Sequence, residues 1–233
     1  MEETRSFERL PESLPADPLH WVEAWLGEAV ARGITRNPNA MTLATVAANG
    51  APSARVVLCK HFVPDPGYLV FFTNYRSRKA RELEHNARAA ACFHWDALGR
   101  QVRIEGPTVR SPAEESDAYF ATRPWGSQLG AWASDQSTPL ASRAALVGQV
   151  RQRAAELGLA LGADTATLAA GTQPPAIPRP PHWGGIRLWV ESVELWVEGA
   201  DRLHDRAVFR RELAPRDAHS FTATDWTGSR LQP

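Results

Sequence analysis

The stretch from residue 41 to residue 79 decides the fold. It reads MTLATVAANGAPSARVVLCK over 41–60 and, after a short loop, YLVFFTNYRSRK over 68–79. Two runs rich in β-favouring residues flank Asn49-Gly50, a dipeptide that favours a tight type I′ hairpin turn. The apolar run 68–72 predicts a third strand that is buried on both faces. The stretch therefore predicts an antiparallel sheet built around a hairpin.

Cations gather where these strands end. Arg55 and Lys60 bracket the second run, and Arg78 and Lys79 fall in the first turn of a helix predicted over 77–85, with Ser77 as its N-cap. The helix macrodipole disfavours positive charge at that end. Cations there are explained if an anion binds at the helix N-terminus.

The chain contains only two lysines, Lys60 and Lys79, and both lie in this stretch. Codon bias with chance placement is one explanation. The other is that both positions require a compact ammonium group rather than a planar guanidinium, as a phosphate site does.

Composition limits the classes of function. The 233 residues suit one large domain or two small ones, and 26 basic residues balance 26 acidic ones. A zero net charge argues against a general nucleic-acid or membrane surface. The acidic, polar start MEETRSFERLPESLP is unlike a signal peptide, and no apolar run has the length of a membrane span, so we expect a cytoplasmic protein. Nine tryptophans suit a flat aromatic ligand or an obligate interface.

The remaining chain predicts further strands and peripheral helices. We expect residues 1–16 to be mobile and 17–233 to form one domain that contains a Pro-rich linker at 162–181. Helices are predicted to begin at Asp17-Pro18, at a capping box formed by residues 111–114, and near residue 139; strands are predicted over 89–95, 101–109, 186–197 and 206–213. This pattern predicts a mainly β protein with peripheral helices (α+β), in which a barrel carries its helices outside.

Several cations each have a structural and a functional explanation. Arg55 and Lys60 are five residues apart, so a regular strand points them to opposite faces, and each alone is explained as a cation at the rim of the sheet. Tyr119 and Arg123 are four apart and share a face if both are helical, with Pro124 ending the helix. Arg123 would then either compensate the helix dipole or bind an anion.

The run Arg202-Leu203-His204-Asp205-Arg206 favours a functional site. In extended chain Arg202, His204 and Arg206 project to one face, where three groups that can carry positive charge repel one another unless an anion or an electron-rich partner covers them. The other histidines show no metal-ligand spacing, so we expect no metal. The chain also has no Gly-rich phosphate loop, serine nucleophile elbow or dinucleotide fingerprint.

Six motifs, in order along the chain, carry a resemblance to a known family. They are RVVLCK, FFTNYRSRKARELEHN, GRQVRIEG, DAYFATRPWGSQLGAWASDQS, HWGGIRL and RLHDR. The sequence resembles the pyridoxine (pyridoxamine) 5′-phosphate oxidases over about residues 17–213 and in its closing RLQP. The resemblance implies a homodimer of FMN-binding split β-barrels with both active sites at the subunit interface. It also implies oxidation of pyridoxine or pyridoxamine 5′-phosphate to pyridoxal 5′-phosphate, with a hydride passed to FMN and then to O₂, which leaves as H₂O₂.

The resemblance also assigns residues. It implies FMN contacts from Arg55, Val56, Val57, Leu58, Lys60, Phe72, Thr73, Arg78, Lys79, Gln101, Gln136, Ser137, Trp183 and Arg206. It implies that Lys60, Tyr119, Arg123 and Ser127 surround the substrate phosphate, and that Arg202 and His204 flank the pyridine ring as the catalytic pair.

The sequence departs from the family pattern at several points and leaves two other readings. The segment SFERLPESLP has a single arginine where the family often has several, Cys59 replaces an aliphatic residue, and segments 162–181 and 214–225 are longer than typical. One alternative is a related FMN oxidase of the phenazine-biosynthesis type, although the intact phosphate set argues against it. The other is a split barrel that binds flavin without catalysis, which would lose Arg202 and His204.

Overall fold

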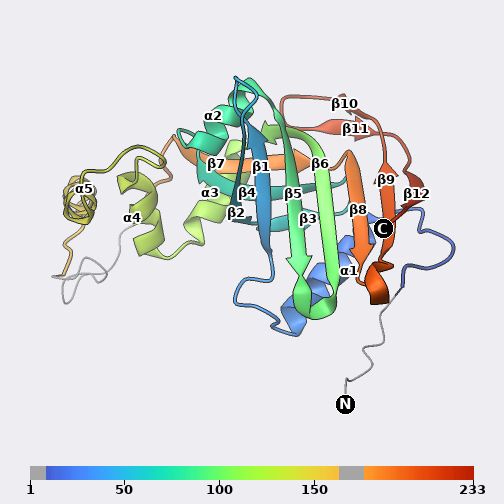
Figure 1. The fold of residues 1–233 in the computed structure, drawn as a ribbon. Coiled ribbons are helices and arrows are strands. Elements are labelled where there is room, and N and C mark those ends of the chain that lie inside the picture. The colour runs from blue at the N-terminus through green and yellow to red at the C-terminus, as the bar shows by residue number, and fades with distance from the viewer. Residues whose placement is uncertain (1–8, 163–175) are drawn as a thin grey trace, which may run out of the picture. The chain divides into compact units, whose positions relative to one another are not determined.

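The computed structural model describes residues 9–162 and 176–233 (Figure 1). Its α-helices are α1 (Leu19–Ala31), α2 (Arg78–His85), α3 (Ala113–Ala121), α4 (Trp125–Ala133) and α5 (Arg143–Glu156), and its 3₁₀ turns are η1 (Asp96–Leu98) and η2 (Ala200–Arg202). Its strands are β1 (Ala40–Val46), β2 (Pro52–Leu58), β3 (His61–Val63), β4 (Tyr68–Asn74), β5 (Arg88–Trp95), β6 (Arg100–Arg110), β7 (Trp183–Trp189), β8 (Ser192–Val197), β9 (Asp205–Arg210), β10 (Leu213–Pro215), β11 (Phe221–Ala223) and β12 (Thr227–Leu231). The predicted class, mainly β with peripheral helices, is confirmed.

The chain divides into two compact units. Unit 1 comprises Met1–Phe71, Glu82–Val109 and Ile186–Pro233, and unit 2 comprises Phe72–Arg81 and Arg110–Gly185. Much of the predicted linker 162–181 and half of the predicted mobile segment 1–16 lie outside the described residues. Within the described part of that segment, Leu10 is buried and its N–H donates to Asp205 Oδ2 at 2.8 Å. The mobility of the segment stays a prediction.

Unit 1 contains most of one large antiparallel sheet. Its strands follow the order β12-β9-β8-β6-β5-β1-β2, while β7 pairs with β6 and β4, and β4 pairs with β3. Along each strand, every second residue points to one face of the sheet. On that face Leu43 of β1, Ile104 of β6 and Val193 of β8 are completely buried. The aromatic run on β4 is buried on both faces, as predicted, with Leu69 and Phe71 fully enclosed.

Helix α1 supplies the other side of this core and lies behind the sheet in Figure 1. Its apolar stripe, which includes Val22 and Trp25, is buried. The helix begins one residue later than predicted, and the N–H of Leu19 donates to Asp17 Oδ1 at 2.8 Å. Arg100 on β6 donates to Glu28 Oε2 at 2.6 Å and therefore ties the helix to the sheet.

The hairpin between β1 and β2 exists, but its predicted turn type is wrong. Val46 pairs with Pro52, so five residues connect the strands rather than two. The N–H of Gly50 donates to the Ala47 carbonyl at 2.9 Å, and of the predicted pair only Gly50 has a positive φ, +81°. The pairing register lengthens the loop, so the asparagine takes an ordinary conformation.

The predicted capping box of α3 is also wrong. Pro112 is the N-cap and has no side-chain acceptor, and Ser111 Oγ is buried without a hydrogen-bond partner among the described residues. The N–H of Ser111 pairs with the Gly185 carbonyl at 3.0 Å, which holds that residue beside β7. Helix α4 follows after one short turn and was not predicted. The strands predicted over 186–197 and 206–213 are each divided, into β7 and β8 and into β9 and β10.

A buried carboxylate fastens α2 to the hairpin within unit 1. Glu82 is 5% exposed and accepts hydrogen bonds from the hydroxyls of Thr45 and Ser53, the latter at 2.7 Å. It also accepts from Arg55 Nη2 at 3.2 Å. Arg55 Nη1 in turn donates to Thr45 Oγ1 at 2.6 Å and to the Leu43 carbonyl at 3.1 Å. The guanidinium of Arg55 is therefore fixed before any ligand binds.

We expect Glu82→Gln to lower the free energy of unfolding by about 1–3 kcal/mol, because a neutral amide replaces a buried, charge-assisted acceptor. Glu84→Gln on the exposed side of the same helix is the matched control and should change stability by less than about 0.5 kcal/mol. Urea unfolding of the three proteins measures both. Equal midpoints for the two variants would show that the buried carboxylate does not hold the hairpin.

Candidate functional site

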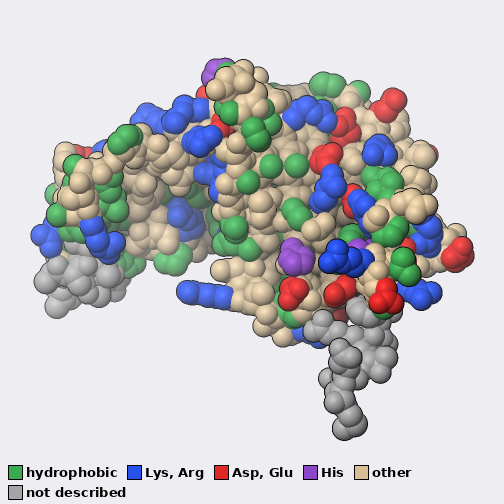
Figure 2. All heavy atoms as spheres, viewed as in Figure 1, with side chains coloured by type: hydrophobic (Ala, Val, Ile, Leu, Met, Phe, Trp, Pro, Cys, Tyr) green, Lys and Arg blue, Asp and Glu red, His purple; other side chains and the backbone are tan. Residues whose placement is uncertain are grey.

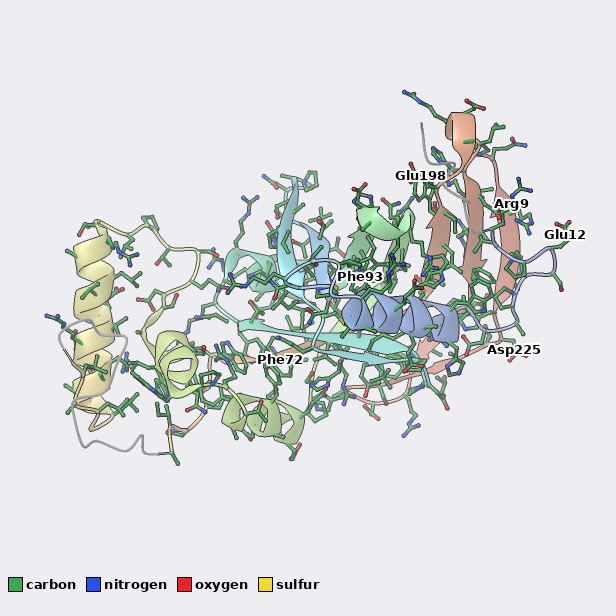
Figure 3. All side chains as sticks on the ribbon, turned by 90° about the horizontal axis from the view of Figure 1, so that it is seen from below. Arg9, Glu12, Phe72, Phe93, Glu198 and Asp225 are labelled. Atoms are coloured by element: carbon green, nitrogen blue, oxygen red, sulfur yellow. The ribbon has the colours of Figure 1, made fainter. Side chains whose placement is uncertain are left out.

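Four of the predicted site residues in unit 2 form one aromatic cluster. The ring of Phe72 on β4, labelled in Figure 3, is one member of this cluster. It stacks on Tyr119 of α3, with 3.9 Å between ring centroids and 14° between planes. Trp183 on β7 lies 5.4 Å from Phe72 and nearly parallel to it, at 11°. The guanidinium carbon of Arg123 lies 4.5 Å above the Trp183 ring. The cluster joins residues that the resemblance divides between FMN and substrate.

Arg123 has the most exceptional environment in this cluster. Its side chain is half-buried, and Nη1 is buried with no hydrogen-bond partner among the described residues. Burial lowers the pKa of the guanidinium from its ordinary value, although an arginine remains charged at physiological pH. A buried, charged donor without a partner is unfavourable, so this position suits an anion.

The helical face predicted to carry both Tyr119 and Arg123 is wrong. Helix α3 ends at Ala121, so Arg123 lies in the turn before α4 and does not continue the helical face. Both side chains nevertheless contact the same aromatic cluster. Ser127 lies exposed in the first turn of α4, where its N–H donates to the Pro124 carbonyl at 2.8 Å.

A second group of predicted residues meets around Lys79. Its ammonium donates to Gln136 Oε1 at 2.9 Å and to Thr73 Oγ1 at 3.1 Å. The Thr73 hydroxyl also donates to Gln136 Oε1 at 3.2 Å. Ser77 is the N-cap as predicted, since its Oγ accepts from the N–H of Ala80 at 3.4 Å. The structure therefore brings together FMN candidates from β4, α2 and the loop after α4.

Backbone strain coincides with the predicted site. Ser137, Asp201 and Arg202 have φ of 71°, 54° and 63°, and no other described residue except glycine has a positive φ. Such conformations are unfavourable for side chains with a Cβ and concentrate at functional sites. Two of the three residues are predicted ligand contacts.

In unit 1, Arg55 lies on the core face of the sheet. It is directly opposite Leu43 on β1, which is opposite Ala91 on β5, and Ala91 is opposite Ile104 on β6. The next residue of β2, Val56, points the other way and is 67% exposed. Among the other predictions, Val57 and Leu58 are half-buried, while Lys60, beyond the end of β2, and Arg78 are exposed.

Gln101 and Arg206 lie on the opposite face of the same sheet. Trp196 on β8 is directly opposite both of them, in neighbouring strands. Gln101 is three residues from the buried Ile104, so these two side chains point to opposite faces. Figure 2 shows charged side chains of both signs over β6, β8 and β9 on this outer face.

His204 adjoins this group through Trp196. The two rings lie 4.5 Å apart, and the N–H of Gly199 donates to His204 Nδ1 at 3.2 Å. Because Nδ1 accepts a hydrogen bond, a neutral His204 carries its proton on Nε2. The ring is therefore held in one orientation and one tautomer by its own chain.

The extended conformation predicted for Arg202 is wrong. The 3₁₀ turn η2 ends at Arg202, and β9 begins only at Asp205. Gly199 allows this turn, since a Cβ there would lie 2.0 Å from the Leu203 carbonyl oxygen. His204 and Arg206 share the surroundings of Trp196, but the shared face of Arg202 is not supported, and its role stays a prediction.

A cavity of about 560 Å³ lies beside His204. Its wall includes Arg9, Glu12 and Glu198, which are labelled in Figure 3, together with Arg230. Residues 9–12 fall in the segment predicted to be mobile, so the sequence does not predict that they line a cavity. They do so by packing against β9 and β12, and such a long-range contact leaves no pattern in the neighbouring residues.

Two further residues were missed, Glu82 and Glu194, which bind the predicted ligand residues Arg55 and Arg206. The sequence of Ser192–Val197 contains a signal for Glu194, because this residue places a carboxylate in the middle of a strand that is mostly apolar.

Over residues 9–162 and 176–233, no group of three histidine, cysteine or acidic residues is arranged to hold a metal ion. Within the same ranges, no helix has the length and apolarity of a membrane span.

Comparison with known proteins gives matches along most of the chain. Residues 27–155 match the family "Pyridoxamine 5′-phosphate oxidase", and residues 183–233 match the "Pyridoxine 5′-phosphate oxidase C-terminal dimerisation region". The pyridoxine/pyridoxamine 5′-phosphate oxidase of Paraburkholderia phytofirmans is 48% identical over 93% of this chain and 89% of its own length. That of Burkholderia cenocepacia is 46% identical with the same coverage.

Solved structures agree on the fold. PhzG from Burkholderia lata, in complex with tetrahydrophenazine-1-carboxylic acid, has a TM-score of 0.74 and 32% identity over 94% of both chains. A pyridoxamine 5′-phosphate oxidase-related, FMN-binding protein from Nostoc punctiforme has a TM-score of 0.63 over 91% of this chain and 97% of its own, and at 18% identity it supports the fold alone. With two family models and relatives at this identity, the chain belongs to the pyridoxine/pyridoxamine 5′-phosphate oxidase family, and its fold is the split β-barrel expected from the sequence.

Proposed function

We propose that the protein is a cytoplasmic, FMN-dependent oxidase that converts pyridoxine or pyridoxamine 5′-phosphate to pyridoxal 5′-phosphate, with O₂ as acceptor and H₂O₂ as product. The observation that carries this proposal is Arg123, a half-buried guanidinium above Trp183 with a buried, unpartnered Nη1. A phosphate supplies the missing acceptor and the negative charge together. The relatives named for this activity share 45–48% of their residues with the chain.

The residues present fit FMN. Lys79, Thr73 and Gln136 bring an ammonium, a hydroxyl and a carboxamide within hydrogen-bond distance of one another. These groups can form hydrogen bonds with phosphate oxygens, or with the carbonyl and N–H groups of a flavin ring. FMN, when bound, supplies the two-electron chemistry, taking the electrons that the substrate loses and giving them to O₂.

In this proposal the protein binds and orients the substrate. Arg123, with Tyr119 and Ser127, holds the phosphate, and a fixed phosphate limits the positions that the pyridine ring can take. His204 meets the ring in a defined tautomer because Gly199 and Trp196 hold it. Arg202 approaches from the 3₁₀ turn beside it.

A phenazine-type substrate is the second candidate, and the PhzG structure favours it. The environment of Arg123 favours the phosphate ester, because a substrate without phosphate leaves the buried Nη1 without an acceptor. A split barrel that only binds flavin is the third candidate. The fixed His204 beside a cavity argues for catalysis, since a passive flavin carrier needs neither.

We also propose that the protein works as a homodimer. Arg55 and Arg206 lie on opposite faces of one sheet, so a single flavin cannot touch both within one chain. In a homodimer, one flavin can contact both residues if Arg55 comes from one copy and Arg206 from the other. Two large apolar side chains in the predicted site motifs, Val56 and Leu203, are 67% and 72% exposed in the single chain, and the match to a dimerisation region at 183–233 agrees.

The proposed reaction is tested by mixing purified protein with pyridoxine 5′-phosphate or pyridoxamine 5′-phosphate in air. We expect a yellow protein whose extracted chromophore is FMN, and equal amounts of pyridoxal 5′-phosphate and H₂O₂. Unphosphorylated pyridoxine is the control and should react far more slowly at the same concentration. Turnover of a reduced phenazine carboxylate without turnover of the phosphate esters would transfer the assignment to the second candidate.

Arg123 and Lys79 should affect different ligands. Arg123→Ala should weaken the phosphorylated substrate by about ten- to a hundredfold with little change in FMN affinity, since it removes one charge-assisted phosphate contact. Lys79→Ala should weaken FMN by a similar factor and the substrate little. Flavin fluorescence titration and steady-state kinetics at saturating FMN separate the two, and equal losses of both ligands in either variant would show that the two anion sites are wrongly assigned.

The dimer is tested with two exposed valines. Val56→Asp should shift the protein toward monomer in sedimentation velocity, because the interface would have to bury a carboxylate. Val30→Asp, at a residue of α1 that is 57% exposed, is the matched control and should leave the dimer intact. An unmutated protein that sediments as a monomer while active would overturn the proposal.

A further inference from the structure

Four charged side chains form a continuous chain of ion pairs across the outer face of β6, β8 and β9. Glu105 accepts from Arg103 at 2.7 Å, and Arg103 Nη1 donates to Glu194 Oε2 at 3.1 Å. The other oxygen of Glu194, Oε1, accepts from Arg206 Nε at 3.0 Å and from Arg206 Nη2 at 2.9 Å. Both carboxylate oxygens of Glu194 are therefore used.

Burial distinguishes Glu194 from the other members of this chain. Its side chain is 8% exposed, whereas the side chains of Arg103 and Glu105 are 46% and 44% exposed and that of Arg206 is 26% exposed. A carboxylate buried to this degree is unfavourable unless cations pair with it. Glu194 therefore depends on the two arginines that pair with it.

The strand register explains why the carboxylate reaches Arg206. Glu194 is directly opposite Arg103 on β6 and Val208 on β9, so Arg206 is its diagonal neighbour on the same face. Arg206 Nη1 also donates to the Gln232 carbonyl at 2.9 Å. All three guanidinium nitrogens are thus bonded to the protein's own chain, which fixes the plane of the group while its exposed part faces outward.

We infer that Glu194 is a positioning residue for the flavin site: it holds the Arg206 guanidinium in the orientation that contacts FMN. The inference rests on the proposed function, which places Arg206 against the cofactor. A guanidinium fixed in advance loses little freedom when the ligand binds, and its donors meet the ligand in one geometry. Glu194 itself touches neither cofactor nor substrate.

The test is FMN affinity of the apoprotein, measured by quenching of flavin fluorescence. We expect Arg206→Ala to weaken FMN by about ten- to a hundredfold and Glu194→Gln by about three- to tenfold. Glu105→Gln, which alters the same ion-pair chain without touching Arg206, should bind FMN like the unmutated protein. Glu194→Gln with unmutated affinity overturns the inference.

A double-mutant cycle separates positioning from a general effect on folding. In the Arg206→Ala background, Glu194→Gln should weaken FMN no further, because the group it positions is gone. An equal loss in both backgrounds overturns the inference. If Glu194→Gln alone does not fold, Arg103→Gln/Glu194→Gln replaces the ion pair with two amides that can bond each other. This double variant should show the same loss of FMN affinity, and unmutated affinity in it also overturns the inference.

The outcomes for the proposed function are distinct. An unmutated protein that binds no FMN refutes the proposed function, whatever the variants do. If the unmutated protein binds FMN strongly and Arg206→Ala does not change this affinity, Arg206 does not contact the cofactor and the inference is overturned. The proposed oxidase activity and the proposed phosphate contact of Arg123 are then judged by their own assays.

Discussion

Carboxylates that hold arginines are the interaction on which unit 1 depends. Glu82 joins α2 to the hairpin through Arg55, Glu28 joins α1 to β6 through Arg100, and Glu194 joins β8 to its two neighbours. Glu82–Arg55, Glu28–Arg100 and Glu194–Arg103 connect elements that are distant in sequence, whereas Glu194–Arg206 joins the consecutive strands β8 and β9. Because a buried charge needs its partner, each pair also fixes the register in which those elements meet.

The same pairs prepare the proposed cofactor site. Arg55 and Arg206 reach their places through contacts inside the chain, so FMN would meet guanidinium groups that are already oriented. Carboxylates balance the charges of both arginines. Their main contribution to FMN binding would therefore be hydrogen bonds in a fixed direction rather than net positive charge. Arg123 is different, because aromatic rings surround it and its buried Nη1 has no acceptor in the described chain. Arg55 and Arg206 are thus paired within the chain, whereas Arg123 is the group that we propose binds the substrate phosphate.

The arrangement of the sheet gives a structural reason for the proposed homodimer. Candidates for one flavin lie on both faces of a single sheet, with Arg55 on the core face and Gln101 and Arg206 on the outer face. A second copy can place its outer face against the first copy's site. The exposed Val56 next to Arg55 then becomes part of an interface, where its apolar surface is covered.

The sequence by itself determined most of the strands and helices, and the family. The apolar run 68–72 predicted the buried strand β4, Ser77 was predicted to cap α2, and the ordered motifs indicated the candidate site residues and the family. These features depend on neighbouring residues or on whole motifs, so a single sequence carries them.

Only the tertiary structure decided the partners and the exact conformations. The register with β2 changed the hairpin turn, η2 removed Arg202 from the strand, and α3 ended before Arg123. Glu194 meets Arg103 from 91 residues away. Such contacts come from strand order and register, which local propensity does not encode, and they determine which arginines pair with a carboxylate of the same chain.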